Sequence, residues 1–544
     1  MPERFCNLVA GLLCLSPFVQ PSAQESLSLS ELEMRGATIG RINFDIDNVF
    51  DPDNNPEEDK RLYRWANKVH LTTRPSAVED IILFSSGEAL SEQRIAESAR
   101  ILRDRGFVAE AAIDASNYNP ATNTADIDVW MRDAWSLEPD IKLSRSGGEN
   151  EYGIGLVEDN LFGLGKSLTA SYSSDVDRDQ RLFSYTDQNV AGSRKRIAAT
   201  YVDLSDGRQA RFVAGRPFYA LDTRWSIESE VLDDERIDSI YDLGEVIDEF
   251  HHDRRIVSIQ GGRSRGISDG RARRWFAGFT FEEHEFREST AFGPPALLPE
   301  NRRLIYPWAG FQWIGDDWRE VSEVDDIGRT EDISLGLNLF GRIGVASPRF
   351  DSDRRAVLFD LSAARGWEPH GPGSLFQFSA STTTRIEDRD FQNTIVAISG
   401  RYLKRNFGDE LFLASVRTVL SNELDAENQI LLGGDSDLRG YPLRYQSGER
   451  SIILSLEQRF YTDWYPFRLI RVGYAFFLDA GRVWDDDPRN TPNLSTLYDV
   501  GVGLRLTSPR SSSGSVVHID LAFPVNAPAD IDDVQIVIER KASF

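Results

Sequence analysis

Residues 472–481 read Val-Gly-Tyr-Ala-Phe-Phe-Leu-Asp-Ala-Gly, so large apolar side chains alternate with mostly small or charged ones. Successive side chains of a β-strand point to opposite faces. Tyr474, Phe476 and Leu478 therefore share one face, and Asp479 lies on the other. The first face suits hydrocarbon and the second suits a polar interior. This two-residue period is typical of a strand in a transmembrane β-barrel.

The same alternation continues on both sides of this run. From Pro139 onward, short runs of alternating polarity are separated by Gly, Asp, Asn and Pro turns. A mean hydropathy of −0.38 is compatible with a barrel, because only every second strand residue needs to be apolar. We predict an all-β antiparallel transmembrane barrel over 139–544, although a soluble β-sandwich or solenoid shows the same period. The clearest predicted strands are 451–461, 471–484, 497–507, 516–524 and 534–544.

The first residues have the pattern of a secretory signal peptide. An apolar run at 8–15 follows a basic residue, and Ala23 offers a small residue for cleavage. We therefore expect a signal peptide over 1–23. A lipoprotein signal at Cys14 is the alternative, but leucines precede that cysteine where small residues are wanted. Cys6 and Cys14 are the two cysteines of the chain, so the exported protein is expected to have no disulfide.

Residues 36–135 differ in pattern from the predicted barrel. Ala125, Ile127 and Val129 alternate with polar residues, which predicts a strand with one buried and one wet face. The order β-α-α-β-β indicates a small α+β domain. Its expected elements are a strand at 39–44, helices at 57–69 and 91–105, and strands at 108–115 and 124–131.

The charge of the chain excludes one class of partner. The 87 acidic and 61 basic residues give a net charge of −26. Nucleic-acid binding requires a field of Lys and Arg that neutralises phosphates. We therefore predict no nucleic-acid partner, and we expect most of the acidic residues to lie in solvated loops.

One stretch matches a hydrolase pattern. Residues 262–266 read Gly-Arg-Ser-Arg-Gly, which would make Ser264 the nucleophile of a surface-anchored hydrolase. A nucleophile elbow needs a buried strand before it and a packed helix after it. Residues 267–274 instead predict a turn. The sequence therefore predicts no catalytic constellation, no enzyme activity, no metal and no cofactor.

Several stretches look like parts of one family. These are 82–88 with 105–107, 158–166, 433–441 and 476–484. Together they resemble the BamA/TamA-type outer-membrane assembly and translocation superfamily, the bacterial surface antigen family. The resemblance implies one POTRA-like α+β periplasmic domain over 36–135, followed by an antiparallel barrel of about 16 strands in the bacterial outer membrane. With 16 strands, some candidate runs between 139 and 421 would be loop hairpins or parts of one long tilted strand.

The motif that carries this resemblance most strongly is Leu438-Arg439-Gly440-Tyr441. In the family, a loop with this motif precedes the last five strands and folds back into the barrel. A guanidinium pairs well with carboxylates in a confined space. Alternation places Glu457 and Asp479 on the lumen faces of consecutive strands, so our hypothesis is that Arg439 reaches one or both.

The neighbouring residues complete this predicted lock. Gly440 would allow a tight backbone turn, and Tyr441 would pack on the inner wall. The alternative is that Arg439 is simply one more lumen charge. The terminal Phe544 resembles an outer-membrane insertion signal, although Ala542 stands where a second aromatic residue is often found.

The resemblance implies that the protein assembles or translocates polypeptides through a POTRA-fronted barrel. A sheet edge in the POTRA-like domain could receive an extended or unfolded polypeptide by strand addition. The other implied partners are outer-membrane lipid and periplasmic proteins docked on the POTRA-like domain. The alternative is a structural or channel-forming outer-membrane barrel whose POTRA domain docks partners.

Overall fold

The computed structural model describes residues 27–52, 56–58, 60–289, 298–322, 324–325, 329–371, 373–405, 410–484, 495–512, 515–525, 527–529 and 531–541. The predicted signal peptide at 1–23 and the terminal Phe544 lie outside the described residues. No helix in these ranges is long and apolar enough to cross a membrane.

The chain forms two compact units. One consists of Met1–Asn43, Ser85–Glu92 and Asp114–Asp128, and the other of Phe44–Phe84, Gln93–Ile113 and Val129–Phe544. Because the predicted domain over 36–135 contributes to both units, its identity as a single POTRA-like domain stays a prediction.

The N-terminal elements follow the expected order of strand, helices and hairpin. The strands form a sheet in the order β1-β3-β2. In β3, Ala125, Ile127 and Val129 are buried and their neighbours are half-buried, as the alternation predicted. The elements are α1 (Leu29–Met34), β1 (Thr38–Asp47), α2 (Arg61–Val69), α3 (Pro75–Glu79), α4 (Glu92–Arg103), β2 (Val108–Asn119) and β3 (Thr124–Asp133).

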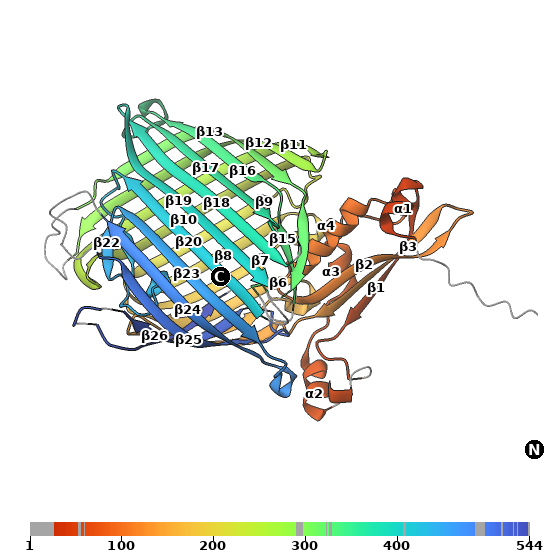
Figure 1. The fold of residues 1–544 in the computed structure, drawn as a ribbon. Coiled ribbons are helices and arrows are strands. Elements are labelled where there is room, and N and C mark those ends of the chain that lie inside the picture. The colour runs from red at the N-terminus through yellow and green to blue at the C-terminus, as the bar shows by residue number, and fades with distance from the viewer. Residues whose placement is uncertain are drawn as a thin grey trace, which may run out of the picture. The chain divides into compact units, whose positions relative to one another are not determined.

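The rest of the chain builds a closed antiparallel barrel (Figure 1). Before the middle of the chain, its strands are β4 (Leu137–Ser146), β5 (Glu149–Glu158), β6 (Lys166–Ser174), β7 (Asp179–Asp187), β8 (Arg196–Leu204), β9 (Gly207–Arg216), β10 (Trp225–Asp242), β11 (Glu245–Ser268), β12 (Arg271–Glu288) and β13 (Arg302–Gly315). The later strands are β16 (Asn338–Ala346), β17 (Ala356–Trp367), β18 (Ser374–Glu387), β19 (Asp390–Arg405), β20 (Glu410–Asn422), β23 (Arg450–Tyr461), β24 (Arg471–Trp484), β25 (Leu497–Thr507), β26 (Val516–Pro524) and β27 (Gln535–Lys541).

The expected count of about 16 strands is wrong, because twenty strands of the described chain close the barrel. Most of the runs before residue 421 are barrel strands, because many of the turns between them are very short, such as the one at 147–148 between β4 and β5. One loop hairpin of the expected kind is present, in the connection between β13 and β16. The last five strands, in contrast, begin and end within one residue of their predicted bounds wherever the structure describes them.

The two faces of β24 differ as the alternation predicted. In β24, Tyr474, Phe476 and Leu478 are exposed, whereas Phe477 is 5% and Asp479 0% exposed. An outward apolar face and a buried polar face fit a wall between hydrocarbon and a filled lumen.

Consecutive strands run in opposite directions, which gives the barrel two distinct ends. We call the end where β4 begins the proximal end and the opposite end the distal end. The turns at 147–148 and 243–244 and the connection 423–449 are distal. The turns at 269–270 and 508–515 are proximal.

A small hairpin at the proximal end is not part of the barrel sheet, but its Val324 and Ile333 pack against wall residues such as Leu403. Its strands, β14 (Trp318–Ser322) and β15 (Thr330–Ser334), pair only with each other among the described residues. Asp325 accepts hydrogen bonds of 2.7 and 3.0 Å from Arg401 of β19. Arg329 donates to the carbonyl oxygens of Pro509 and Ser511 in the β25–β26 turn. The hairpin therefore reaches from the β13–β16 connection to the far wall and lies across the proximal mouth.

Candidate functional site in the barrel lumen

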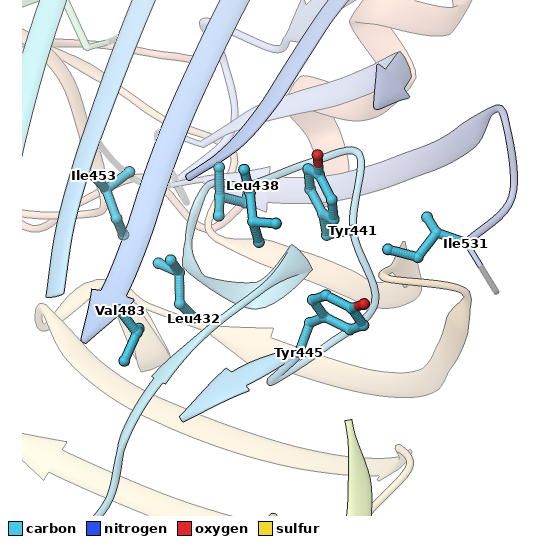
Figure 2. Close-up of a cluster of buried hydrophobic side chains, with 8 residues drawn as sticks. Leu432, Leu438, Tyr441, Tyr445, Ile453, Val483 and Ile531 are labelled. Atoms are coloured by element: carbon cyan, nitrogen blue, oxygen red, sulfur yellow. The ribbon is translucent and has the colours of Figure 1, made fainter. Parts of the chain in front are cut away.

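The connection 423–449, which we call the lumen loop, folds into the barrel instead of extending away from it. A two-stranded stem, β21 (Ile430–Leu432) with β22 (Gln446–Gly448), supports its tip. Leu438, Tyr441 and Tyr445 at the tip are at most 2% exposed. Figure 2 shows these side chains packed in one apolar cluster with residues of the wall. The cluster consists of Leu432, Leu438, Tyr441, Tyr445, Ile453, Val483, Leu497 and Ile531.

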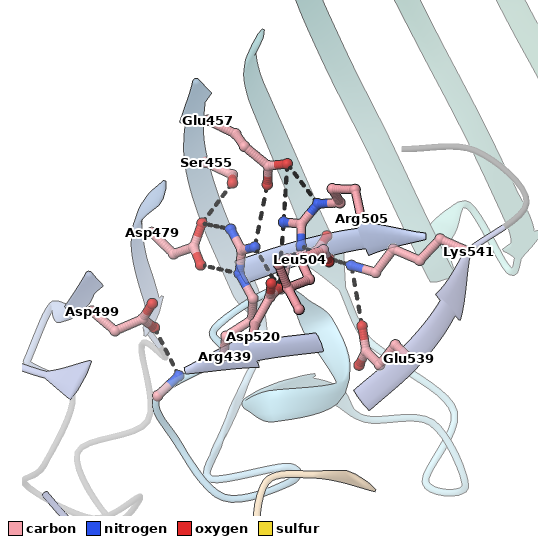
Figure 3. Close-up of polar contacts among 12 residues, drawn as sticks. Arg439, Ser455, Glu457, Asp479, Asp499, Leu504, Arg505, Asp520, Glu539 and Lys541 are labelled. Atoms are coloured by element: carbon pink, nitrogen blue, oxygen red, sulfur yellow. Dashed lines mark hydrogen bonds and ion pairs between the residues drawn. The ribbon is translucent and has the colours of Figure 1, made fainter. Parts of the chain in front are cut away.

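Arg439 lies at the centre of a buried network of charges (Figure 3). Its Nε and Nη2 donate to the two oxygens of Asp479 at 2.7 and 3.0 Å. Its Nη1 donates to Glu457 at 3.2 Å and to Asp520 at 2.9 Å. The guanidinium also lies over the ring of Phe477, with 3.3 Å between Cζ and the ring centroid. One loop residue thus binds three strands of the wall.

Two further arginines balance the charge of these carboxylates. Arg459 donates to Glu457 at 2.8 Å, and Arg505 donates to Glu457 at 3.0 and 3.1 Å. Arg505 also pairs with Asp520. Buried ions are tolerated only when they are paired and hydrogen-bonded. Three guanidiniums and three carboxylates meet this condition together, so removal of one leaves an uncompensated charge.

The next residue of the motif binds a fourth carboxylate. Asp479 and Asp499 are direct cross-strand partners in the β24–β25 ladder. Like charges in such a pair repel each other. Arg439 neutralises Asp479, and the Gly440 backbone N–H donates to Asp499 at 3.0 Å. The Arg-Gly dipeptide therefore binds both members of the pair.

Gly440 lies in the predicted tight turn, which the Tyr441 N–H closes on the Leu438 carbonyl at 3.1 Å, but glycine is required there for close approach and not for its φ. Its backbone does not adopt a left-handed φ. A Cβ at this position would lie 2.7 Å from the Asp499 Cβ and 3.2 Å from the Pro524 nitrogen. Only glycine brings the N–H within hydrogen-bond distance of the carboxylate.

Tyr441 and Leu438 attach the tip to the same strands. The Tyr441 hydroxyl donates to the Tyr498 carbonyl at 3.0 Å and accepts from the Tyr498 N–H at 3.2 Å. Leu438 lies over Gly481, where a Cβ would be 2.7 Å from the leucine Cδ1. The aromatic residue therefore pairs with the first residues of β25 much as a neighbouring strand would.

Other contacts hold the loop near the distal end. Asp425 accepts two hydrogen bonds from Arg385, at 2.8 and 2.9 Å. Arg444 donates to both oxygens of Asp177 at 2.6 and 2.7 Å, and the Tyr241 hydroxyl donates to the same carboxylate. Burial raises the pKa of Asp177, but the hydrogen bonds from Arg444 and Tyr241 lower it by more, so the net shift is downward.

The loop also contacts both strands at the seam where the barrel closes. The β4–β27 ladder has one registered pair in the described chain, Arg145 with Ile538. On the β4 side, the Ser146 hydroxyl donates to the Gly434 carbonyl at 2.8 Å. On the β27 side, Lys541 donates to Asp437 at 2.9 Å. Burial raises the pKa of Asp437, but Lys541 and Arg417 lower it to about 2.

A polar cavity of about 710 Å³ remains in the lumen. Asp435, Asp437 and Arg439 of the lumen loop line one part of it, and Asp325 and Ser334 of the proximal hairpin line another. The loop and the hairpin thus bound the cavity from opposite ends of the barrel.

The structure brings together all six residues of the predicted lock: Leu438, Arg439, Gly440, Tyr441, Glu457 and Asp479. Sequence reasoning did not assign Arg459, Arg505 or Asp520 to it. All three alternate with apolar residues in the predicted strands 451–461, 497–507 and 516–524, which is typical of a polar strand face, but the register between strands cannot be read from the sequence. Phe544 lies outside the described residues.

The residue of the hydrolase pattern lies in a different context. Ser264 is part of β11, and a turn and then β12 come after it. Its hydroxyl donates to the Arg273 carbonyl at 2.9 Å. In the described part of the chain, no three His, Cys, Asp or Glu side chains have a metal-binding arrangement.

A closed barrel with an apolar outer face and a charged, loop-filled lumen defines the class of this protein as a bacterial outer-membrane β-barrel. Residues 371–540, which contain the whole lock, match the Omp85 superfamily domain. The family resemblance indicated by the sequence is therefore confirmed for this part of the chain, which is similar to the Omp85 superfamily domain.

Three solved structures resemble the chain over 92% of its length. They are BamA from Haemophilus ducreyi lacking POTRA domains 1–3 (14% identity, TM-score 0.38, 84% of that chain), CdiB from Acinetobacter baumannii (13%, 0.43, 73%) and CdiB from Escherichia coli (13%, 0.46, 76%). These values are too low to transfer a function from any of the three. No curated protein matches the sequence.

Proposed function

We propose that this protein assembles or translocates polypeptides at the bacterial outer membrane, and that a client strand enters or leaves at the β4–β27 seam. The observation that carries the proposal is the single registered pair at the seam, beside ladders of seven pairs in β26–β27 and ten in β4–β5. A strand edge without a ladder offers backbone N–H and C=O groups to another chain. Strand addition uses these groups.

The lumen loop has the role of a lock in this proposal. It binds β4 through Ser146 and β27 through Lys541, so it bridges the two strands that must separate. The network around Arg439 fixes the same loop to β23, β24 and β26. Release of the loop would remove both bridges at once. Undocking of the loop from the lumen is therefore coupled to separation of β4 from β27.

The N-terminal sheet has the role of a receiver in this proposal. We assign residues 36–135 as a POTRA-like periplasmic domain that presents a sheet edge to extended polypeptides or periplasmic partners. No cofactor is invoked, because folding of the client supplies the driving force.

A disulfide across the seam tests the proposal. The partners Arg145 and Ile538 are changed to cysteine, since a directly opposed antiparallel pair has a Cα separation that a disulfide can bridge. Neither native cysteine interferes, because Cys6 and Cys14 lie in the predicted signal peptide. The matched control replaces Val502 and Leu521, an opposed pair within the β25–β26 ladder.

Each variant is expressed in cells depleted of the native protein, and the outer-membrane and secreted proteins are quantified with and without reductant. We expect the oxidised seam variant to lose the same proteins as depletion, and the reductant to restore them. The control pair should complement under both conditions. Full complementation by the oxidised seam variant would show that the seam does not open. Altered solute permeability with an unchanged protein profile would favour the channel-forming alternative.

A further inference from the structure

Four exposed arginines surround the proximal turn between β11 and β12: Arg263, Arg265, Arg271 and Arg273. None of the four guanidiniums forms an ion pair with a carboxylate in the described part of the chain. Asp269 in the same turn receives a hydrogen bond from Ser268 instead. In a chain with 87 acidic and 61 basic residues, such a group of arginines is available to an anion outside the protein.

A groove in the outer wall leads up to these arginines. It has a volume of about 660 Å³, and its floor includes the small residues Gly261 and Ala277. Trp225, Ile227 and Trp275 rise on its sides and are 42%, 48% and 64% exposed. All three point outward, as does the apolar face of these strands. The groove is therefore apolar and faces the hydrocarbon of the membrane.

The strand register places one arginine at the end of the groove. Arg263 is the direct partner of Trp225 on β10 and of Trp275 on β12. Gly261, two residues farther from the proximal end, is the partner of Ile227 and Ala277. A charged group thus lies between two tryptophans at the level where the apolar groove ends. Tryptophans mark the boundary between hydrocarbon and headgroups in membrane proteins.

Cation–π contacts extend this boundary to the neighbouring strands. The Arg216 guanidinium lies 4.2 Å from the Trp225 ring centroid, and that of Arg273 lies 4.7 Å from the Trp313 ring centroid. Arginines held along an aromatic belt lie at the depth of lipid phosphates. In a phospholipid, the acyl chain lies in the hydrocarbon and the phosphate lies at its boundary. The groove and Arg263 are arranged in the same way.

We propose that this groove is a binding site for one anionic phospholipid. The phosphate contacts Arg263, with Arg265 and Arg273 beside it, and one acyl chain lies over Gly261 and Ala277 between the two tryptophans. Residues 36–135, proposed above to be periplasmic, directly precede β4, which begins at the proximal end. The proximal end therefore faces the periplasm, and the lipid belongs to the inner leaflet. The site does not depend on client handling, because it is on the outer wall.

Two variants remove different parts of the site, and neither is expected to destabilise the barrel. Arg263→Gln removes the charge facing the phosphate. Gly261→Leu fills the groove, and its Cβ meets no atom closer than the Ser226 carbonyl oxygen at 3.8 Å. Arg181→Gln is the matched control, because it removes the same charge from an exposed position at the distal end. Heat-modifiable migration in gels verifies that each barrel is folded.

Native mass spectrometry of the detergent-solubilised full chain, titrated with dioleoyl phosphatidylglycerol, measures the site directly. We expect one tightly retained lipid in the wild type and in Arg181→Gln. Arg263→Gln should bind it about fivefold more weakly, since one arginine near a phosphate contributes about 1 kcal/mol. Gly261→Leu should lose the tight site. Phosphatidylcholine, which carries no net charge, should bind more weakly and without dependence on Arg263.

Retention of phosphatidylglycerol at the wild-type level by both folded variants would overturn the proposal. Preferential retention of lipopolysaccharide in a parallel titration would overturn the assignment to an inner-leaflet phospholipid. Neither result would bear on the seam, because the disulfide experiment follows client proteins and not bound lipid.

Discussion

Replacement of Arg439 by alanine is expected to release the lumen loop while the barrel stays folded. The change removes four hydrogen bonds to three carboxylates. Glu457 and Asp520 keep Arg505 as a partner, whereas Asp479 keeps the Ser455 hydroxyl. The main effect is thus that Asp479 is left as an uncompensated buried carboxylate, which destabilises the docked loop by roughly 3–5 kcal/mol. At about 1.4 kcal/mol per tenfold, the docked population falls roughly a hundredfold to a few thousandfold.

Hydrogen–deuterium exchange of peptides covering 430–448 measures this release. Exchange protection of the loop should fall by the same factor, up to the limit set by the distal contacts of Asp425 and Arg444, while peptides from β24 and β25 change little. Arg417→Ala is the matched control. Arg417 pairs with Asp437 of the same loop, but its side chain is 53% exposed. An exposed pair contributes roughly 0–1 kcal/mol, so the control should lower protection by no more than about fivefold.

A double variant separates the loss of a charge pair from a general disturbance. Arg439→Met combined with Asp479→Leu removes both members of the strongest pair, so no uncompensated carboxylate remains at Asp479. We expect it to recover much of the docking lost in Arg439→Ala, because apolar replacement of a buried pair is often nearly neutral. Unchanged protection in Arg439→Ala would refute the lock, since the loop would then be held without its central contact.

Three other measurements address separate parts of the loop and lumen. Gly440→Ala should cost roughly 1–3 kcal/mol of docking through overpacking, seen as lower loop protection, whereas Gly341→Ala, with its nearest neighbouring atom at 3.6 Å, should change little. The pKa of Asp177 is lowered in the folded state. Its ion pair with Arg444 therefore stabilises the docked loop fully at a pH above the ordinary pKa of about 3.9, and this stabilisation is lost as the pH falls through the folded pKa. Loop protection, corrected for intrinsic exchange, should therefore decline below about pH 4, and less steeply in Asp177→Asn; equal profiles would contradict this. Deletion of the β14–β15 hairpin (318–334) should raise single-channel conductance in planar bilayers, and unchanged conductance would show that the hairpin does not close the mouth.

The sequence predicted most reliably those features that depend on local alternation. The strands around Asp479 were predicted correctly, because a two-residue period is visible within a single strand. The same period assigned Asp479 and Glu457 to the lumen. The strand count was wrong because the number of strands depends on which runs pair with each other, and that is a long-range property.

The full set of residues in the charge network could not be predicted either, because it also depends on long-range pairing. Alternation within a strand is enough to assign Arg505 and Asp520 to polar faces, but their contact with Glu457 and Arg439 depends on the offset between β23, β25 and β26. A shift by one residue would turn each side chain to the other face. The opposition of Asp479 and Asp499, which explains why arginine and glycine are adjacent in the motif, also appears only when the register is known.

The partners of Arg439 impose an order on the biogenesis of the barrel. Its three carboxylates come from β23, β24 and β26, so the guanidinium has no complete binding place until the penultimate strand has joined the sheet. Insertion of the tip is consequently a late event that reports a nearly finished C-terminal half. A chain stalled before β26 would expose Arg439 at the loop tip together with the incompletely neutralised Glu457 and Asp479. Periplasmic quality-control proteases could distinguish such a chain from the mature protein by these exposed charges.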